Sequence, residues 1–374
     1  MYRLYRYEMF LTRIINSTLR LSSEKIPLTR YSHLHNSGPS VGKYSVVSVY
    51  HLSKVEDVDR AVHGVRKWLQ QKGATGRFQI NSQGVNCQLC FNSEDQVDTL
   101  RYLLSQCLKV DEEDLRLKVQ KSDFVVYKRL RIKKKLVEYL DDDADISERG
   151  EHLDREQWNK LLEDHPDSLV LDIRNDYEWE VGRFKQAERP QLSRFREFPR
   201  LADEVAEKVS GQDRKVMMYC TGGIRCEVFS SMLVKRGVQQ VYQLQDGVLG
   251  YGEGSAEETR HWEGNLFVFD DRLVVPIDGV AGGEKDKPIS RCKHCGELSE
   301  MVYNCHGHRC NDVFVSCMKC AAALQGYCSE TCRAGAREIF RARNYRQWRG
   351  KLVGRGEHYR QLADNLSDTN TNLS

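Results

Sequence analysis

The sequence predicts a multidomain protein of mixed α+β and α/β class, with three folded regions in series. Three patterns indicate this. Strand and helix signals follow the order β-α-β-β-α-β over residues 44–127, short buried strands alternate with helices over residues 154–244, and eight of the 13 cysteines fall between Cys292 and Cys332. A chain of 374 residues is long enough for two or three domains.

Residues 1–43 differ in composition from the rest of the chain and are predicted to precede the first domain. They are rich in Arg and Ser, and their acidic residues are Glu8 and Glu24. A basic amphipathic helix at the start would be typical of a transit peptide for the mitochondrion or another organelle. The alternative is an unstructured extension of a cytoplasmic protein, because Glu8 interrupts the pattern.

Residues 44–140 are predicted to form a ferredoxin-like (acylphosphatase-like) sandwich. We expect helices over 55–71 and 96–108, and strands over 44–52, 76–80, 85–91, 115–119 and 124–127. This order of elements is the signature of that fold. Cys87 and Cys90 lie on one strand and point to opposite faces, so we interpret them as core thiols rather than as metal ligands.

A basic run closes this first domain. Lysines and arginines in such a cluster favour an RNA-binding surface, whereas the alternative is an ordinary solvated edge. The candidate RNA-binding residues are Lys128, Arg129, Arg131, Lys133, Lys134 and Lys135.

Residues 141–280 begin with an acidic linker and continue as a predicted α/β domain. Apolar runs over 168–173, 215–219 and 241–244 indicate buried parallel strands. We expect a helix over 154–165 before the first strand, and helices over 201–209 and 227–236 between the strands. Ligands bind at the carboxyl ends of such strands, and Cys220 directly follows the second strand.

The loop that starts at Cys220 has the features of an activated thiolate. The segment is Cys220, Thr221, Gly222, Gly223, Ile224, Arg225 and Cys226, and a helix is predicted to follow it. A helix N-terminus and free backbone N–H groups stabilise an anion, and two glycines let the backbone form a cradle. Arg225 adds a positive charge, so we expect the thiol pKa to fall below its free value of about 8.5.

The size of this loop separates two chemistries. Related phosphatases have five residues between Cys and Arg, whereas four residues separate Cys220 from Arg225. A smaller cradle suits a single added sulfur or oxygen atom better than a phosphate. Cys226 has two interpretations: it resolves an oxidised Cys220 or relays its sulfur, or it is a small core residue.

Several segments together resemble the tRNA uridine-hydroxylase family of rhodanese proteins. The strand with Asp172 and Arg174 resembles the Asp-x-Arg strand of the rhodanese superfamily, where both residues support the site. The matching segments are 131–136, 171–178, 182–187, 195–199, 220–227, 241–249 and 262–272, so the resemblance covers residues 44–278.

The resemblance implies a tRNA-modifying oxidoreductase. Its substrate would be a wobble uridine that is hydroxylated at C5 with O₂ as co-substrate, and Cys220 and Arg225 would be the catalytic residues. One alternative is a sulfurtransferase of the thiosulfate type, in which Cys220 carries a persulfide sulfur from a donor, such as a sulfur-donor protein, to an acceptor. A further alternative is a non-enzymatic interaction module, in which the rhodanese domain and a C-terminal zinc domain, described next, only bind partners.

Residues 281–362 are predicted to form a zinc-binding domain that ends in a basic helix. Eight thiolates suffice for two structural Zn²⁺ sites with four sulfurs each, either in sequence or crossed. The ligands are Cys292, Cys295, Cys305, Cys310, Cys317, Cys320, Cys328 and Cys332. Residues 363–374 have the composition of a disordered tail, and no run is long and apolar enough for a membrane span.

Overall fold

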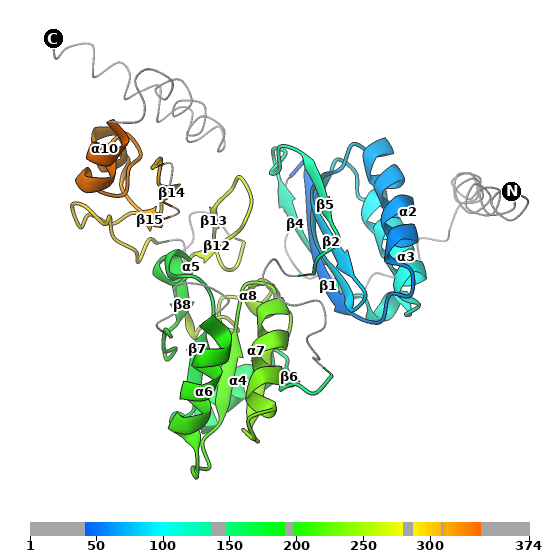
Figure 1. The fold of residues 1–374 in the computed structure, drawn as a ribbon, viewed down its shortest axis with the longest axis horizontal. Coiled ribbons are helices and arrows are strands. Elements are labelled where there is room, and N and C mark those ends of the chain that lie inside the picture. Colours follow the sequence, from blue (N-terminus) through cyan, green and yellow to red (C-terminus); the bar gives the residue numbers. More distant parts are fainter. Residues whose placement is uncertain are drawn as a thin grey trace, which may run out of the picture.

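The computed structural model describes residues 42–136, 147–190, 197–279, 287–307, 310 and 312–337. These residues form three regions along the chain (Figure 1). Nearly all of the predicted leader, the predicted tail and most of the basic stretch after Gly335 lie outside the described residues. A search of the described residues finds no helix that is long and apolar enough to cross a membrane.

The N-terminal region is a five-stranded sheet with the strand order β4-β1-β3-β2-β5. The first four strands are antiparallel to their neighbours, and β5 pairs with β2 in parallel. The elements are β1 (Tyr44–Leu52), α2 (Val58–Gln71), β2 (Thr75–Asn81), β3 (Gly84–Phe91), α3 (Asp95–Leu108), the short 3₁₀ helix η1 (Glu112–Asp114), β4 (Lys118–Ser122) and β5 (Leu130–Lys133).

The two faces of this sheet differ in polarity. Helices α2 and α3 cover one face, where Val47, Phe78 and Leu89 are buried with the apolar sides of both helices. Cys87 belongs to this core, while Cys90 packs on the opposite face against Val126. The prediction that the two thiols lie on opposite faces of one strand is therefore confirmed.

The last predicted strand of this region, 124–127, is wrong. Strand β4 covers 118–122, and Ser122 ends it because its hydroxyl donates to the Phe124 carbonyl and accepts from the Phe124 amide. Val126 is buried, but its carbonyl accepts from the Asp271 amide instead of joining the sheet. The fifth strand is β5, which lies inside the basic run.

The middle region contains a four-stranded parallel sheet with the order β6-β10-β9-β7. The three predicted strands are confirmed as β7, β9 and β10, whereas β6, only three residues long, was not predicted. The elements are β6 (Glu151–Leu153), α4 (Arg155–Asp164), β7 (Leu169–Asp172), α5 (Asp176–Val181), β8 (Gly182–Phe184), α6 (Phe198–Val209), β9 (Val216–Tyr219), α7 (Ile224–Val234), β10 (Val241–Leu244) and α8 (Gly247–Tyr251).

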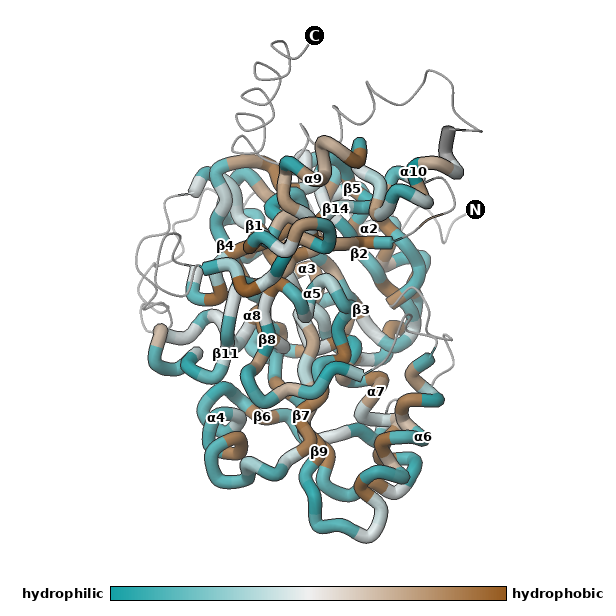
Figure 2. Tube along the Cα trace, turned by 90° about the vertical axis from the view of Figure 1, so that its left-hand side faces the viewer, coloured by the Kyte–Doolittle hydropathy of each residue, from teal (hydrophilic) through white to brown (hydrophobic). Residues whose placement is uncertain are grey.

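Helices cover both faces of this parallel sheet. Leu171 and Met218 pack with α6 and α7 on one face, while Val170 and Met217 pack with α4 and α8 on the other. Consecutive strand residues point to opposite faces, so strands covered on both sides become continuous apolar runs. Figure 2 shows β7 and β9 as hydrophobic segments of the chain.

The C-terminal region has short elements and a small core. The elements are β11 (Trp262–Gly264), β12 (Leu266–Phe267), β13 (Val274–Val275), β14 (Val302–Asn304), β15 (Val313–Val315), α9 (Met318–Ala323) and α10 (Glu330–Arg337). Strand β11 pairs with β8 of the middle region. The core after residue 300 is built largely from Tyr303, Phe314 and Tyr327 with several cysteines. A core this small usually needs cross-links, such as a metal, to be stable.

Candidate active site

Cys220 lies at the carboxyl end of β9, directly before the loop that leads into α7. Its side chain is buried, and the Gly223 amide donates to its Sγ at 3.1 Å. Gly223 has a φ of 96°, a conformation that other residues rarely adopt. A Cβ atom at this position would also lie 2.6 Å from the Tyr50 hydroxyl oxygen. Glycine is therefore required where the loop turns its amide toward the sulfur.

The surroundings of Cys220 favour its thiolate form. Burial raises the pKa of Cys220, but a hydrogen bond from the Cys226 thiol, the charge of Arg225 and the backbone amides of both residues lower it more. The resulting pKa of Cys220 is about 6, so the prediction that it lies below the value of a free thiol agrees in direction. Burial and the contact with Cys220 raise the pKa of Cys226 well above its usual value, so at neutral pH Cys226 is a neutral hydrogen-bond donor.

The guanidinium of Arg225 is paired with a buried carboxylate. Two of its nitrogens donate to Glu178, each at 2.9 Å, and one also donates to the Thr221 hydroxyl. Thr221 in turn donates to Glu178 at 2.5 Å. Burial raises the pKa of Glu178, but the charge of Arg225 lowers it more, to about 2. Glu178 was not predicted as a site residue from the sequence, and it holds Thr221 and Arg225 of the loop in place.

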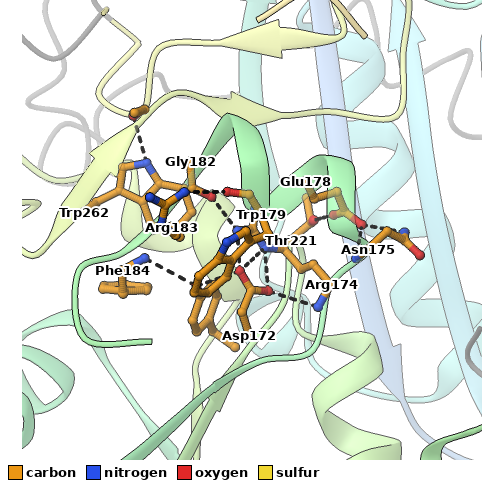
Figure 3. Close-up of polar contacts among 12 residues, drawn as sticks. Asp172, Arg174, Asn175, Glu178, Trp179, Gly182, Arg183, Phe184, Thr221 and Trp262 are labelled. Carbon is orange, nitrogen blue, oxygen red and sulfur yellow. Dashed lines mark hydrogen bonds and ion pairs between the residues drawn. The ribbon is translucent and has the colours of Figure 1, made fainter. Parts of the chain in front are cut away.

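Asp172 and Arg174 form a second buried network below the loop (Figure 3). Their side chains are joined at 2.6 Å, and Arg174 also donates to the Gly182 carbonyl at 2.6 Å. The Tyr219 hydroxyl donates to Asp172 at 2.7 Å, and the guanidinium lies 5.1 Å from the centre of the Trp262 ring. Asp172 and Arg174 thus join the carboxyl ends of β7 and β9, and the Cys220 loop begins at the end of β9.

A cavity of about 820 Å³ opens above Cys220, and all three regions of the chain line it, the C-terminal region through Val268, Phe269, Asp270 and Arg272. Cys220, Thr221, Gly222 and Arg225 form one wall. The opposite wall is the sheet face of the N-terminal region that carries no helix, with Ser48, Tyr50, Arg77, Gln79, Asn86, Gln88, Lys118 and Gln120. None of these residues was predicted from the sequence to belong to the site. Polar residues at alternate strand positions could have indicated an exposed face, but not what faces it.

Polar contacts join the two walls. Tyr50 donates to Glu227 on α7 at 3.0 Å, and Lys118 forms an ion pair with Asp246 at 2.8 Å. The amide of Val248, two residues after Asp246, donates to the Cys220 carbonyl at 2.9 Å. The N-terminal sheet is therefore tied to both segments that hold the cysteine loop, α7 and the start of α8.

The predicted RNA-binding run lies at the edge of the wall that the N-terminal sheet forms. Arg131 and Lys133 on β5 pair with Arg77 and Gln79, so they point to the same face of the sheet. Lys133 ends β5, at the edge of the sheet, and Lys134 forms an exposed ion pair with Asp59 on α2. The residues that line the cavity include none of the six predicted RNA-binding residues. The cations at the cavity are Arg77, Lys118, Arg225 and Arg272 instead.

The eight cysteines of the C-terminal region form two groups. Cys292, Cys295, Cys317 and Cys320 make the first group, and Cys305, Cys310, Cys328 and Cys332 make the second. Within each group the sulfur atoms lie within 4.8 Å of one another. The two groups interleave along the chain, so the crossed arrangement is the one that forms.

Three family models match successive parts of the chain. The UPF0176 acylphosphatase like domain matches residues 44–136, and the Rhodanese-like domain matches residues 154–253. The model described as Rhodanase C-terminal matches residues 263–333.

Curated relatives match most of the chain. The tRNA uridine(34) hydroxylase of Protochlamydia amoebophila is 36% identical over 79% of this chain and 89% of its own. That of Chlamydia felis is 34% identical over 86% and 95%, respectively. A solved thiosulfate sulfurtransferase from Pseudomonas aeruginosa is 22% identical over 27% of this chain and 18% of its own, with a TM-score of 0.24, which is too low to support a functional argument.

Proposed function

Because the chain belongs to the tRNA uridine(34) hydroxylase family, we propose that it hydroxylates C5 of the wobble uridine in tRNA, with Cys220 as the reacting thiolate. The pKa of Cys220, about 6, keeps the sulfur largely ionised at neutral pH. Arg225, held by Glu178, stabilises that anion from one side, and the Gly223 amide does so from the other.

The cavity above Cys220 is the structural observation that supports this proposal. Its volume of about 820 Å³ lies within the range of about 300–1,000 Å³ that is usual for small-molecule sites. It is larger than thiosulfate requires, and its mixed lining of polar side chains and of apolar ones such as Leu249 and Phe269 suits a nucleotide. A base in a folded tRNA must leave its stack to reach a buried sulfur, so the substrate would enter as an extruded nucleotide.

The overall reaction balances with O₂ and a thiol reductant. One oxygen atom of O₂ enters the C5–H bond of uracil and forms C5–OH. The other oxygen atom leaves as water after it takes two electrons and two protons from two thiols, which become a disulfide. The structure supplies the thiolate and its anion-stabilising surroundings for this reaction.

We also propose that the two cysteine groups each hold a structural Zn²⁺. Zinc binds thiolates at about 2.3 Å, which places tetrahedral sulfurs roughly 3.8 Å apart. Sulfur separations of 3.6 Å between Cys295 and Cys317 and of 3.4 Å between Cys305 and Cys332 are close to this value. Four sulfurs fill each tetrahedron, so these ions would stabilise the small core and leave no position for a substrate.

Nucleoside mass spectrometry of tRNA tests the proposed activity. A strain that lacks the gene should lose 5-hydroxyuridine-type nucleosides, and the wild-type chain should restore them whereas C220S should not. Unchanged nucleosides in the deletion strain would contradict the hydroxylase. Transfer of sulfur from thiosulfate to cyanide by the purified protein, lost in C220S, would favour the sulfurtransferase instead.

A further inference from the structure

The cavity wall opposite Cys220 is an ordered row of polar side chains. Ser48 on β1 pairs with Gln88 on β3, which pairs with Arg77 on β2, and Lys118 on β4 pairs with Ser48. Residues that pair across strands point to the same face of a sheet. Gln88 therefore lies near the middle of the wall, with Lys118 on one side of its row and Arg77, which pairs with Arg131 on β5, on the other.

The side-chain amide of Gln88 has a fixed orientation. Asn86 is 8% exposed, and its Nδ2 donates to the Leu136 carbonyl at 3.2 Å. A carbonyl can only accept, so this bond fixes which end of the Asn86 amide is the oxygen. That oxygen accepts from Gln88 Nε2 at 2.7 Å. The Gln88 oxygen, Oε1, is consequently turned away from Asn86.

Gln88 Oε1 is a preorganised acceptor on the cavity wall. Among the described residues, no donor contacts this oxygen, although Gln88 lines the cavity. Gln79 and Gln120 also line the cavity, but within the described part of the chain their side chains have no hydrogen-bond partner that would orient them. An acceptor held in place by a neighbour loses little entropy when a ligand binds.

The chemistry of the pyrimidine ring decides what such an acceptor selects. In uracil, N3 lies across the ring from C6, so a base whose C5–C6 edge faces Cys220 turns its N3 edge to the opposite wall. Uracil carries a hydrogen on N3, whereas cytosine has an unprotonated acceptor there. We propose that Gln88 Oε1 accepts the N3–H of the substrate uracil and so distinguishes uridine from cytidine; this inference rests on the proposed function.

Binding of short RNAs tests the inference without requiring turnover. The probes are three anticodon stem–loops that carry uridine, cytidine or N3-methyluridine at the wobble position, and the readout is Kd. The wild-type chain should bind the uridine probe about tenfold or more tightly than the other two, because an unpaired buried acceptor costs about 1–3 kcal/mol. Gln88→Met keeps the length of the side chain but has no amide, and it should bind all three probes equally.

Two comparisons decide the outcome. Gln70→Leu changes an exposed glutamine on α2 and should keep the wild-type preference. The inference is overturned if the wild-type chain binds the probes equally, or if Gln88→Met still prefers uridine. Hydroxylation assays on the same preparations address the proposed function separately. A protein that prefers uridine through Gln88 but leaves it unmodified would contradict the hydroxylase and not the role of Gln88.

Discussion

Cys220 and the eight cysteines between Cys292 and Cys332 lie in contrasting surroundings. The sulfur of Cys220 is buried beside a cationic side chain, a thiol and backbone amides, at the wall of a cavity. The eight other sulfurs gather in two groups of four, with members of each group within 4.8 Å of one another. The sulfur of Cys220 is therefore activated for reaction. The eight other sulfurs are grouped as they would be around metal ions.

The contrast shows what makes a thiolate reactive or inert. At Cys220 the anion is stabilised by hydrogen bonds and a nearby positive charge, and the residue lines a cavity. In a four-sulfur site every thiolate would donate a lone pair to the metal, which makes it a poorer nucleophile, and the filled coordination shell would leave no open position. Serine substitutions in the two places should therefore have opposite consequences, and the predictions that follow test this from the largest effect to the smallest.

Replacement of Cys317 by Ser should cost the most free energy. It removes one sulfur from the first group, and structural zinc sites contribute on the order of 10 kcal/mol of binding free energy. We expect the bound zinc to fall from two equivalents to one. We also expect backbone amides in the C-terminal region to exchange their hydrogens faster. Metal analysis by mass spectrometry and hydrogen exchange measure these changes. Two retained equivalents would show that this cysteine is not a ligand.

Replacement of Cys220 by Ser should abolish activity but leave the metal content unchanged. Loss of a reacting nucleophile lowers kcat by about 10⁴-fold or more. Single-turnover assays with tRNA measure the rate, and metal analysis should still find two zinc equivalents. Cys107→Ser, in a half-buried position on α3, is the matched control and should keep the wild-type rate. An active Cys220→Ser protein would show that Cys220 does not take part in the reaction.

Replacement of Arg225 by Ala should destabilise the middle region. Glu178 is buried, and without the guanidinium its carboxylate has lost its charged partner. Breaking a buried ion pair from one side costs about 3–5 kcal/mol. Urea unfolding measures this cost. The double variant with Glu178→Gln should recover part of the stability; no recovery would mean that Arg225 stabilises the loop in another way.

The ionisation of Cys220 should be visible in a pH titration. With a pKa of about 6, the thiolate absorbance should rise through pH 6 and level off below the pKa of about 8.5 of a free thiol. Since the folded pKa is the lower one, this ionisation stabilises the fold fully above the unfolded pKa, and the contribution is lost as pH falls through 6. The spectrum of C220S, subtracted at each pH, isolates this sulfur. A midpoint near 8.5 would contradict the activation of Cys220.

The smallest effect is expected for Tyr50→Phe. The change removes one hydrogen bond to Glu227, which keeps its contacts with Arg149 and His152, so we expect a loss of about 1 kcal/mol. Thermal unfolding followed by near-ultraviolet circular dichroism measures it. If Tyr50→Phe equals the wild type in stability, this contact between the two cavity walls contributes nothing.

Local features of the site could be predicted from the sequence. The Cys220 loop, the strand before it and the helix after it are consecutive in the chain, so glycines, charge and apolar patterning define them together. Six of the cysteines fall in pairs with spacings of two or three residues, such as Cys292 and Cys295, which indicated metal ligands. How the cysteines pair into groups depends on the fold and required the structure.

Features formed by distant segments could not be predicted. Glu178 is 47 residues from Arg225 in the sequence, and nothing local to either residue indicates that they pair. The cavity wall with Gln88 comes from four strands whose polar alternation is typical of any solvated face. The basic run at residues 128–135 could be recognised because its charges are close together in the sequence. The cations that line the cavity could not, because they are scattered along the chain.

The most direct test of the account is to follow the atom that Cys220 transfers. Purified protein would be incubated with unmodified tRNA, a thiol reductant and heavy-isotope O₂, and the nucleosides would be analysed by mass spectrometry. The account predicts that the wobble uridine gains one heavy oxygen atom with the wild-type chain and none with C220S. Oxygen derived from water, sulfur in the nucleoside, or equal product from C220S would contradict it.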